Sequence, residues 1–261
     1  MSFVRAAALS CAVAALSCVS GPARAQDMLR NVDLSQPAYS QAEFSRAEIE
    51  SKIAGGANGV DLSSKSLNGL DLSGLDLSGV NLRAARLVKA KLSGAKLDRA
   101  ILDQAWLLEA DLGGASLRGA HVFAAQMQRA KAAKADFSGS RIAADMTGAD
   151  LSGAIFDKAD LSADMKNQSM GLMRAVLRSA RLEGASFAGA DLARADLRFA
   201  RAAGADFTGA SLKDADAAGA DLTRARLDGA RAEGLDLDSA QIDKSAAEAL
   251  KGALMDRARL H

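Results

Sequence analysis

Alanine recurs at every fifth position between Ala90 and Ala120, and a leucine follows two places after each of the first six alanines. An α-helix repeats every 3.6 residues and a β-strand every two, so neither would keep these side chains on one side. The backbone must therefore turn in another way, with a structural unit of five residues.

The same period extends over most of the sequence. We count 36 leucine-like sites between Leu62 and Ile242, most of them preceded two places earlier by alanine. The register slips by one residue before Met146, and the pattern is interrupted near residues 162–171. Internal repetition on this scale indicates a solenoid, in which each unit stabilises only its neighbours.

A short strand and a corner account for the five residues. If the leucine and the preceding alanine both point inward, the residue between them points outward, as in a strand. The remaining residues must then turn the chain, and Gly and Ser are suited to such corners. Aromatic residues make up only 4% of the chain, which favours a narrow interior filled by Ala and Leu.

The units resemble those of the pentapeptide-repeat family, whose motif is A-(D/N)-L-x-x, as in Ala190-Asp191-Leu192. The resemblance covers roughly residues 58–244. It implies an all-β fold, a right-handed quadrilateral β-helix with four units per coil and about nine coils. Lys65 occupies an inward site of this pattern, so we expect an irregular first coil.

The N-terminal segment, residues 26–57, is expected to protect one end of the solenoid, because open ends expose apolar core and unpaired strand edges. Ser40-Gln41-Ala42-Glu43 has the pattern of a capping box. It predicts a capping helix that ends near Ile53.

Residues 245–261 are expected to form the second capping helix. A capping-box pattern opens this segment at Ser245, and Leu250 and Leu254 would lie on one stripe of the helix. Some members of the similar family form dimers through their C-terminal end. The stripe is therefore either a cap or the surface of a homodimer.

The first 25 residues have the pattern of a secretory signal. Arg5 precedes an apolar run, and Ala23-Arg24-Ala25 forms a small-x-small site, which predicts cleavage after Ala25. Lipidation at Cys18 is less favoured, because the preceding residues fit a lipobox poorly. We therefore expect a periplasmic or secreted protein, and no other segment is apolar enough to cross a bilayer.

An apolar patch is the main candidate site. Residues next to the leucine-like sites should point outward, and most of them are polar or charged. The exceptions gather on two adjoining faces, where aromatic side chains rimmed by charge are typical of partner binding. In the alternative interpretation, the N-terminal segment or the 163–171 loop folds over them. The candidate residues are Val88, Ile101, Trp106, Leu108, His121 and Phe123.

An acidic ladder is a further feature. Asp196, Asp216 and Asp236 are spaced twenty apart, so they should stack on one face, with arginines beside them. A cation could bind there, but a solvated surface with ion pairs fits the pattern better.

The composition gives little support for catalysis. The two cysteines lie in the predicted signal, and the only histidines are His121 and His261. We find no phosphate loop, metal-ligand spacing or dinucleotide fingerprint. The sequence therefore predicts a non-enzymatic protein without a cofactor or metal.

The sequence is most consistent with a secreted rigid module that binds an unidentified protein or has a structural role. One alternative, taken from the family, is a DNA-mimicking modulator of type II topoisomerase (gyrase). The balance of 33 basic and 32 acidic residues argues against it and against DNA binding. A second alternative is a glycan- or peptidoglycan-binding surface that uses Trp106.

Overall fold

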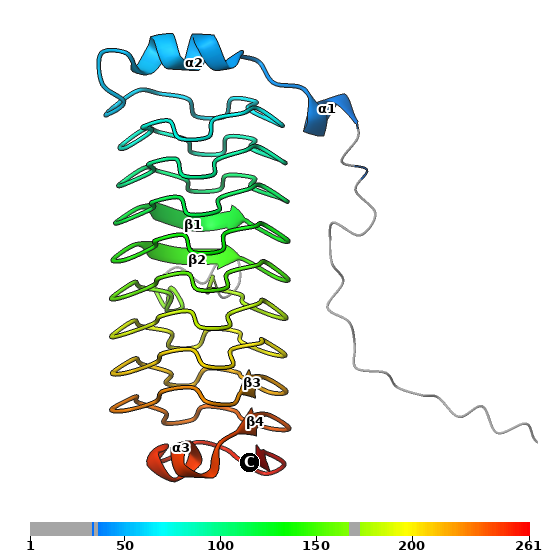
Figure 1. Ribbon diagram of the computed structural model, residues 1–261, viewed down its shortest axis with the longest axis vertical. Coiled ribbons are helices and arrows are strands. Elements are labelled where there is room, and N and C mark those ends of the chain that lie inside the picture. Colours follow the sequence, from blue (N-terminus) through cyan, green and yellow to red (C-terminus); the bar gives the residue numbers. More distant parts are fainter. Residues whose placement is uncertain (1–32, 34–35, 167–172) are drawn as a thin grey trace, which may run out of the picture. The chain divides into compact units, whose positions relative to one another are not determined.

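The computed structural model describes residues 33, 36–166 and 173–261 (Figure 1). The predicted signal and its cleavage site lie outside these residues, as does Cys18, so secretion and lipidation stay predictions. The described residues from 36 onward belong to one compact unit. None of the described helices is long and apolar enough to span a membrane.

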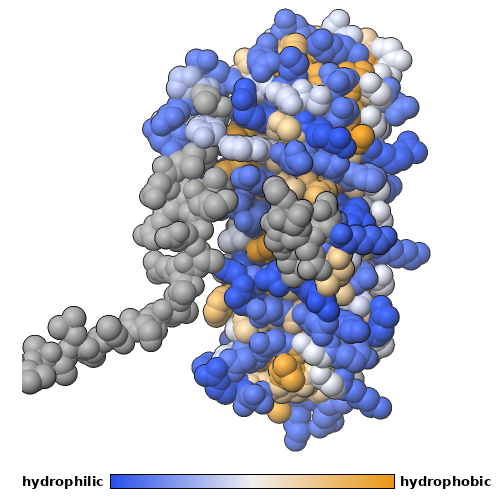
Figure 2. Space-filling view, turned by 180° about the vertical axis from the view of Figure 1, so that it is seen from behind, coloured by the Kyte–Doolittle hydropathy of each residue, from blue (hydrophilic) through white to orange (hydrophobic). Residues whose placement is uncertain are grey.

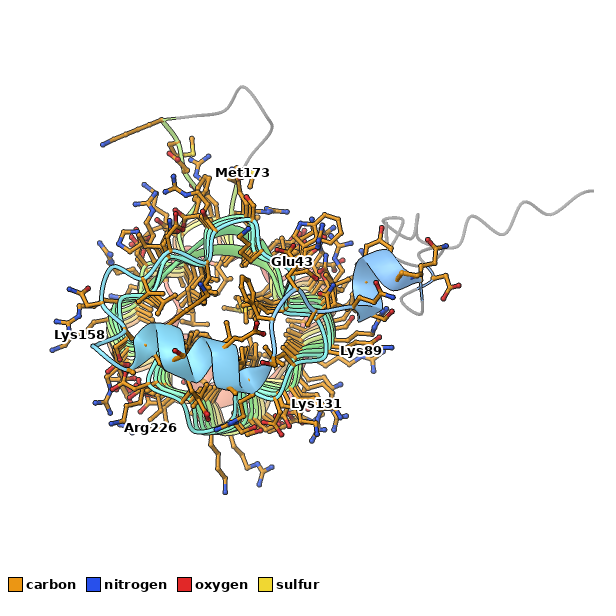
Figure 3. The ribbon with its side chains drawn as sticks, turned by 90° about the horizontal axis from the view of Figure 1, so that it is seen from above. Glu43, Lys89, Lys131, Lys158, Met173 and Arg226 are labelled. Atoms are coloured by element: carbon orange, nitrogen blue, oxygen red, sulfur yellow. The ribbon has the colours of Figure 1, made fainter. Side chains whose placement is uncertain are left out.

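Parallel β-bridges between residues twenty apart define the coils. Each coil contributes four bridging positions, and these give the stack four sides, seen along its axis in Figure 3. The prediction that residues twenty apart lie side by side is confirmed. The first coil pairs Asp61 with Asn81, Ser66 with Arg86, Asp71 with Lys91 and Asp76 with Lys96.

The interior is a column of Ala and Leu, as the repeat predicts. Leu82 and Leu102, for example, are fully buried. On one side four buried phenylalanines replace leucine in successive coils, and their rings stack nearly parallel. Centroid distances are 4.8 Å for Phe137–Phe156, 4.8 Å for Phe156–Phe187 and 5.0 Å for Phe187–Phe207.

The corners are tight turns with a left-handed residue. The Lys65 N–H donates to the Leu62 carbonyl at 3.2 Å, and Ser64 between them has φ of 59°. Glycine takes the equivalent place in many other coils because positive φ costs it nothing. The aspartate before the inward leucine orders the corner too. The Asp71 Oδ1 accepts a hydrogen bond from the Ser73 N–H at 3.1 Å, which lowers the pKa of Asp71.

Continuous strands are short, because each side of a coil offers only one or two bridging residues. β1 and β2 are longer where the register slips: six residues of β1 face five of β2, between the pairs Phe123–Ala143 and Gln126–Asp145. The strands are β1 (His121–Gln126), β2 (Arg141–Asp145), β3 (Asp221–Leu222), β4 (Gln241–Ile242) and β5 (Arg259–Leu260).

The predicted interruption leaves the coil at a corner. The Asp164 N–H donates to the Met173 carbonyl at 2.8 Å, and Val176 then pairs with Asp145, thirty-one residues earlier. Residues 167–172 lie outside the described part of the chain. Met173 marks this place on the outside of the stack in Figure 3.

The N-terminal end carries two helices, α1 (Pro37–Ser40) and α2 (Arg46–Ile53). The helix ends at Ile53 as predicted, but the capping box at Ser40–Glu43 is wrong. Ser45 caps α2 and forms the box with Glu48, because the Glu43 side chain contacts the coil instead. α2 lies across the end of the stack (Figure 1) and buries Ile49 against the core.

The C-terminal end differs from the predicted helix over 245–261. α3 is limited to Lys244–Ala249, begins after Asp243, and lacks a side-chain cap. Gly252, with φ of 81°, turns the chain back into the coil. Leu254 then bridges to Asp236, and β5 pairs with β4. Backbone pairing to the last coil therefore replaces the second half of the helix.

Candidate functional site

One side of the stack differs from the other three, and we call it the Trp106 face. It is the side on which both irregular segments meet the coils: the N-terminal segment lies on it, and the interruption enters it just before Val176. Figure 2, viewed from behind Figure 1, shows apolar residues among hydrophilic ones. The bridging residues of the Trp106 face are Ser66, Arg86, Trp106, Gln126, Asp145, Val176, Asp196, Asp216, Asp236 and Leu254.

On the remaining faces, acidic and basic residues are mixed from coil to coil. One ladder runs through Asp71, Lys91, Asp111, Lys131, Asp150, Arg181, Arg201 and Asp221. Neighbouring coils are joined by ion pairs, such as Arg181–Asp150 at 3.2 Å and Arg226–Asp206 at 2.9 Å. In Figure 3, Lys89, Lys131, Lys158 and Arg226 project away from the axis on different sides. These faces present mixed charge without a continuous acidic stripe.

The structure corrects the predicted exposure of the apolar patch. Val88 and Leu108 are fully buried, whereas Ile101, Trp106 and Phe123 are half-buried and His121 is exposed. The stacking of Ile101 with His121 and of Arg86 with Trp106 is as predicted. The spacing of the sequence correctly predicted which residues stack on one another in successive coils. It did not predict that other parts of the chain would cover some of them.

That cover includes the segment Gln36–Glu43, which we call the strap. Its Tyr39 ring stacks on Trp106, with centroids 6.1 Å apart and planes at 15°. Ala42 pairs in antiparallel fashion with Leu67 in the first coil. The strap thus spans the coils that contain Val88 and Leu108, which supports the alternative that the N-terminal segment folds over the patch.

Glu43 anchors the end of the strap. Its N–H donates to the Ser66 carbonyl at 2.7 Å, and its Oε1 accepts from the Ser66 N–H at 3.1 Å. The carboxylate also lies 3.6 Å from the Lys65 Nζ and 3.7 Å from an Arg86 guanidinium nitrogen. Lys65 is therefore exposed and paired, not inward as the repeat predicted. The repeat gives no indication that Tyr39 and Glu43 belong to this site, because both precede it.

Asp196 forms a second cluster further along the same face. Its side chain is 1% exposed and lies 2.7 Å from Arg178, 2.6 Å from Arg198 and 3.4 Å from Arg174. Burial alone would raise the pKa of Asp196, but the arginine hydrogen bonds outweigh it and lower that pKa to about 2. The predicted solvated surface is therefore wrong at Asp196.

Asp216, one coil away, behaves in the opposite way. Burial raises its pKa, and the nearby charges of Asp196 and Asp236 raise it further, against the hydrogen bond from the Ala218 N–H and the ion pair with Arg198 at 3.1 Å. The predicted acidic ladder therefore holds one strongly stabilised and one disfavoured carboxylate.

Buried polar atoms without a hydrogen-bond partner also gather on the Trp106 face. Within the described part of the chain they are Arg86 Nε, Gln128 Oε1 and Arg178 Nε. Each such atom costs about 1–3 kcal/mol relative to a satisfied one. The polar groups buried on this face are thus incompletely matched.

Within the described ranges, no group of three or more His, Cys, Asp or Glu side chains is placed to hold a metal ion. The expectation of no cofactor stays a prediction.

The two leucines of the predicted cap or dimer surface do not share a stripe. Leu250 is 4% exposed and packs on the core, which agrees with capping, whereas Leu254 is 56% exposed. Leu260 in β5 is also exposed, at 53%. The apolar surface at this end is therefore formed by Leu254 and Leu260.

A homodimer through the C-terminal end stays a prediction with a direct check. Burial of exposed Leu254 and Leu260 against a second copy would favour association. We expect analytical ultracentrifugation to give a dimer for the wild-type protein and a monomer for Leu254→Asp combined with Leu260→Asp. A monomeric wild-type protein at high concentration would contradict this prediction.

Comparison with protein families gives one match. The family model described as pentapeptide repeats matches eight copies, over residues 66–104, 123–162, 172–209 and 205–241. The matched residues amount to more than half of the chain. No protein of curated function matches.

Solved structures of similar proteins also include pentapeptide repeat proteins. HetL, which is involved in heterocyst differentiation regulation in the cyanobacterium Nostoc sp. strain PCC 7120, is 29% identical over 83% of this chain and 97% of its own, with a TM-score of 0.37. QnrB1, a plasmid-mediated fluoroquinolone resistance protein, is 17% identical over 78% and 89%, with a TM-score of 0.46. A protein of the Arabidopsis thaliana thylakoid lumen is 24% identical over 59% and 71%, with a TM-score of 0.27.

Proposed function

This chain belongs to the pentapeptide-repeat family, whose members generally serve as non-enzymatic structural or interaction modules, and on that premise we propose that it binds another protein through its Trp106 face. The rigid stack would present this face without taking part in chemistry. The predicted signal would place the module in the periplasm or outside the cell.

The observation that carries the proposal is the contrast between the faces. On the other three sides, ion pairs join charges of neighbouring coils, as in Lys91–Asp71, Arg141–Asp160 and Arg226–Asp206. The Trp106 face instead combines a half-buried tryptophan, buried aliphatic side chains and three unsatisfied polar atoms. Buried aromatic and arginine side chains of this kind dominate binding energy at protein interfaces.

The two alternatives from the sequence receive less support. A DNA mimic needs a continuous acidic stripe, but the described ladders mix acidic and basic residues, and in the run of three aspartates Asp196 is enclosed by arginines. The Trp106 ring already stacks on the ring of a tyrosine within a peptide segment, and this contact favours a peptide partner over a glycan. A supercoiling assay and titration of Trp106 fluorescence with peptidoglycan fragments test these alternatives.

Affinity capture with matched variants tests the proposal. We expect the wild-type protein and Lys131→Ala, which alters a charged face, to recover the same partner from periplasmic extract. Trp106→Ala should lose at least about tenfold of it, because truncation of a central interface aromatic costs about 2 kcal/mol or more. Leu108 is unsuitable for substitution, since it is buried. Equal recovery with all three proteins, each folded by circular dichroism, would exclude this face as the binding surface.

A further inference from the structure

The strap holds the Trp106 face by three kinds of contact that a separate peptide could reproduce. Tyr39 provides an aromatic ring, stacked on Trp106. The backbone around Ala42 pairs with the first coil, and the Ser66 hydroxyl donates to the Gln41 carbonyl at 2.5 Å. Four residues after the tyrosine, Glu43 provides a carboxylate between two cations. The strap is thus a short peptide that is helical at Tyr39 and extended at Gln41 and Ala42, and its extended end pairs antiparallel with the first coil.

The contacts of the strap are few and weak for a segment of its length. α1 is only four residues long and lacks a side-chain cap. Most strap residues are exposed, with Tyr39 half-buried. The two ion pairs of Glu43 are solvent-exposed and longer than 3.5 Å, and such pairs contribute little. Segments with few buried contacts open more easily than the core they cover.

The strap also leaves its site incompletely satisfied. Arg86 Nε is buried without a hydrogen-bond partner. The Glu43 Oε1 lies 3.7 Å from the other end of the guanidinium, at Arg86 Nη2. A carboxylate placed squarely on the guanidinium could accept from Nε and a terminal nitrogen together, which is the stronger geometry. The site therefore favours a carboxylate that approaches more closely than Glu43 does.

We propose that the surface beneath the strap is a peptide-docking groove and that the strap is its internal occupant. The groove is formed by Lys65, Ser66, Arg86 and Trp106. The partner segment carries an aromatic residue four places before a carboxylate, and its end at the carboxylate is extended. It displaces the strap, adds to the edge of the first coil by backbone hydrogen bonds, and pairs with Arg86. This inference rests on the proposed function and names the chemistry of the partner.

Peptide chemistry fits this groove better than other ligands. Ser66 presents a carbonyl that accepts from a backbone N–H and an N–H that donates to a carboxylate. Addition of a strand to an exposed edge is an established mode of peptide recognition, in which backbone bonds give affinity and side-chain positions give specificity. Lys65 and Arg86 add a requirement for negative charge, and Glu43 is their ion-pair partner within the described residues.

The chain offers an unambiguous readout, because it contains one tryptophan and one tyrosine. We would titrate a synthetic peptide of residues 36–43, QPAYSQAE, into the full-length protein and follow Trp106 fluorescence. The wild-type protein is compared with Tyr39→Ala combined with Glu43→Gln, whose own strap is weakened. Since an attached strap competes at high effective concentration, the double variant should bind the peptide at least about tenfold more tightly than wild type.

Matched peptides test the chemistry. Peptides in which alanine replaces the tyrosine, or glutamine the glutamate, should bind the double variant at least about tenfold more weakly. Equal binding of all three peptides, or equal affinity of both proteins, would overturn the inference. The affinity capture separates this inference from the proposed function. If Trp106→Ala still lowers recovery of the partner, only the peptide-docking inference fails. If Trp106→Ala leaves recovery unchanged, the proposed function fails as well.

Discussion

Phe156→Ala is expected to lower the free energy of unfolding by about 3–5 kcal/mol. Phe156 is fully buried, and its ring lies 4.8 Å from the rings of Phe137 and Phe187. Backbone pairing fixes the spacing of neighbouring coils near 4.8 Å, so the stack cannot collapse to fill the gap. Truncation therefore loses both the transfer free energy and the contacts across the cavity.

Phe156→Leu is the matched control. Leu97 and Leu117 occupy the same column in earlier coils, so the backbone there already accommodates leucine. We expect a loss of about 1–2 kcal/mol in urea denaturation followed by circular dichroism. Because each coil contacts only its neighbours, hydrogen exchange should rise around Phe156 and stay unchanged near Leu82. Equal losses for the two variants, or faster exchange throughout the stack, would contradict this account.

The coil could be predicted from the sequence because every inward position repeats the same local environment. Leu82 is buried for the same reason as Leu102: the bridging residue before each is paired to the coil beyond it. A rule learned from one unit therefore applies to the next, and even the register slip at Met146 was visible.

The cover on the Trp106 face could not be predicted in this way. Tyr39 lies outside the repeat and meets a residue 67 positions later, so no period relates the two. The capping box shows the same limit. Ser40–Glu43 and Ser45–Glu48 both fit the pattern, and the second forms because Glu43 is used by Ser66 and Arg86.

The sequence placed arginines beside the acidic ladder but did not show how many of them would reach Asp196. Arg198 follows Asp196 by two residues, and this pair could be foreseen. Arg174 and Arg178 reach the same carboxylate because they follow the interruption directly, in the preceding coil. Sequence spacing placed Asp196 on a ladder but did not indicate that three guanidinium groups would enclose it.

Asp196→Asn is expected to lower the free energy of unfolding by about 3 kcal/mol at neutral pH. The substitution preserves the size of the side chain but removes the charge that Arg174, Arg178 and Arg198 share. Removal of one partner from a buried ion-pair cluster leaves the others without compensation. The loss should appear as a lower urea midpoint with an unchanged m-value.

Asp216→Asn makes the same chemical change one coil away and should have the opposite sign. Burial raises the pKa of Asp216, so its ionised form is disfavoured in the folded protein. The amide can still accept from the Ala218 N–H, as the carboxylate does at 3.2 Å. We therefore expect no loss, or a small gain, in stability at neutral pH.

The pH dependence of the two variants separates charge from packing. The pKa of Asp196 is about 2 in the folded protein, against 3.8 ordinarily, so its ionisation stabilises the fold above about pH 4. That contribution disappears as the pH falls toward 2, and the deficit of Asp196→Asn relative to wild type should shrink with it. The ionisation of Asp216 costs stability instead, and that cost disappears on acidification. A deficit for Asp196→Asn that persists undiminished at pH 2, or equals that of Asp216→Asn at pH 7, would show that shape and not charge holds this cluster together.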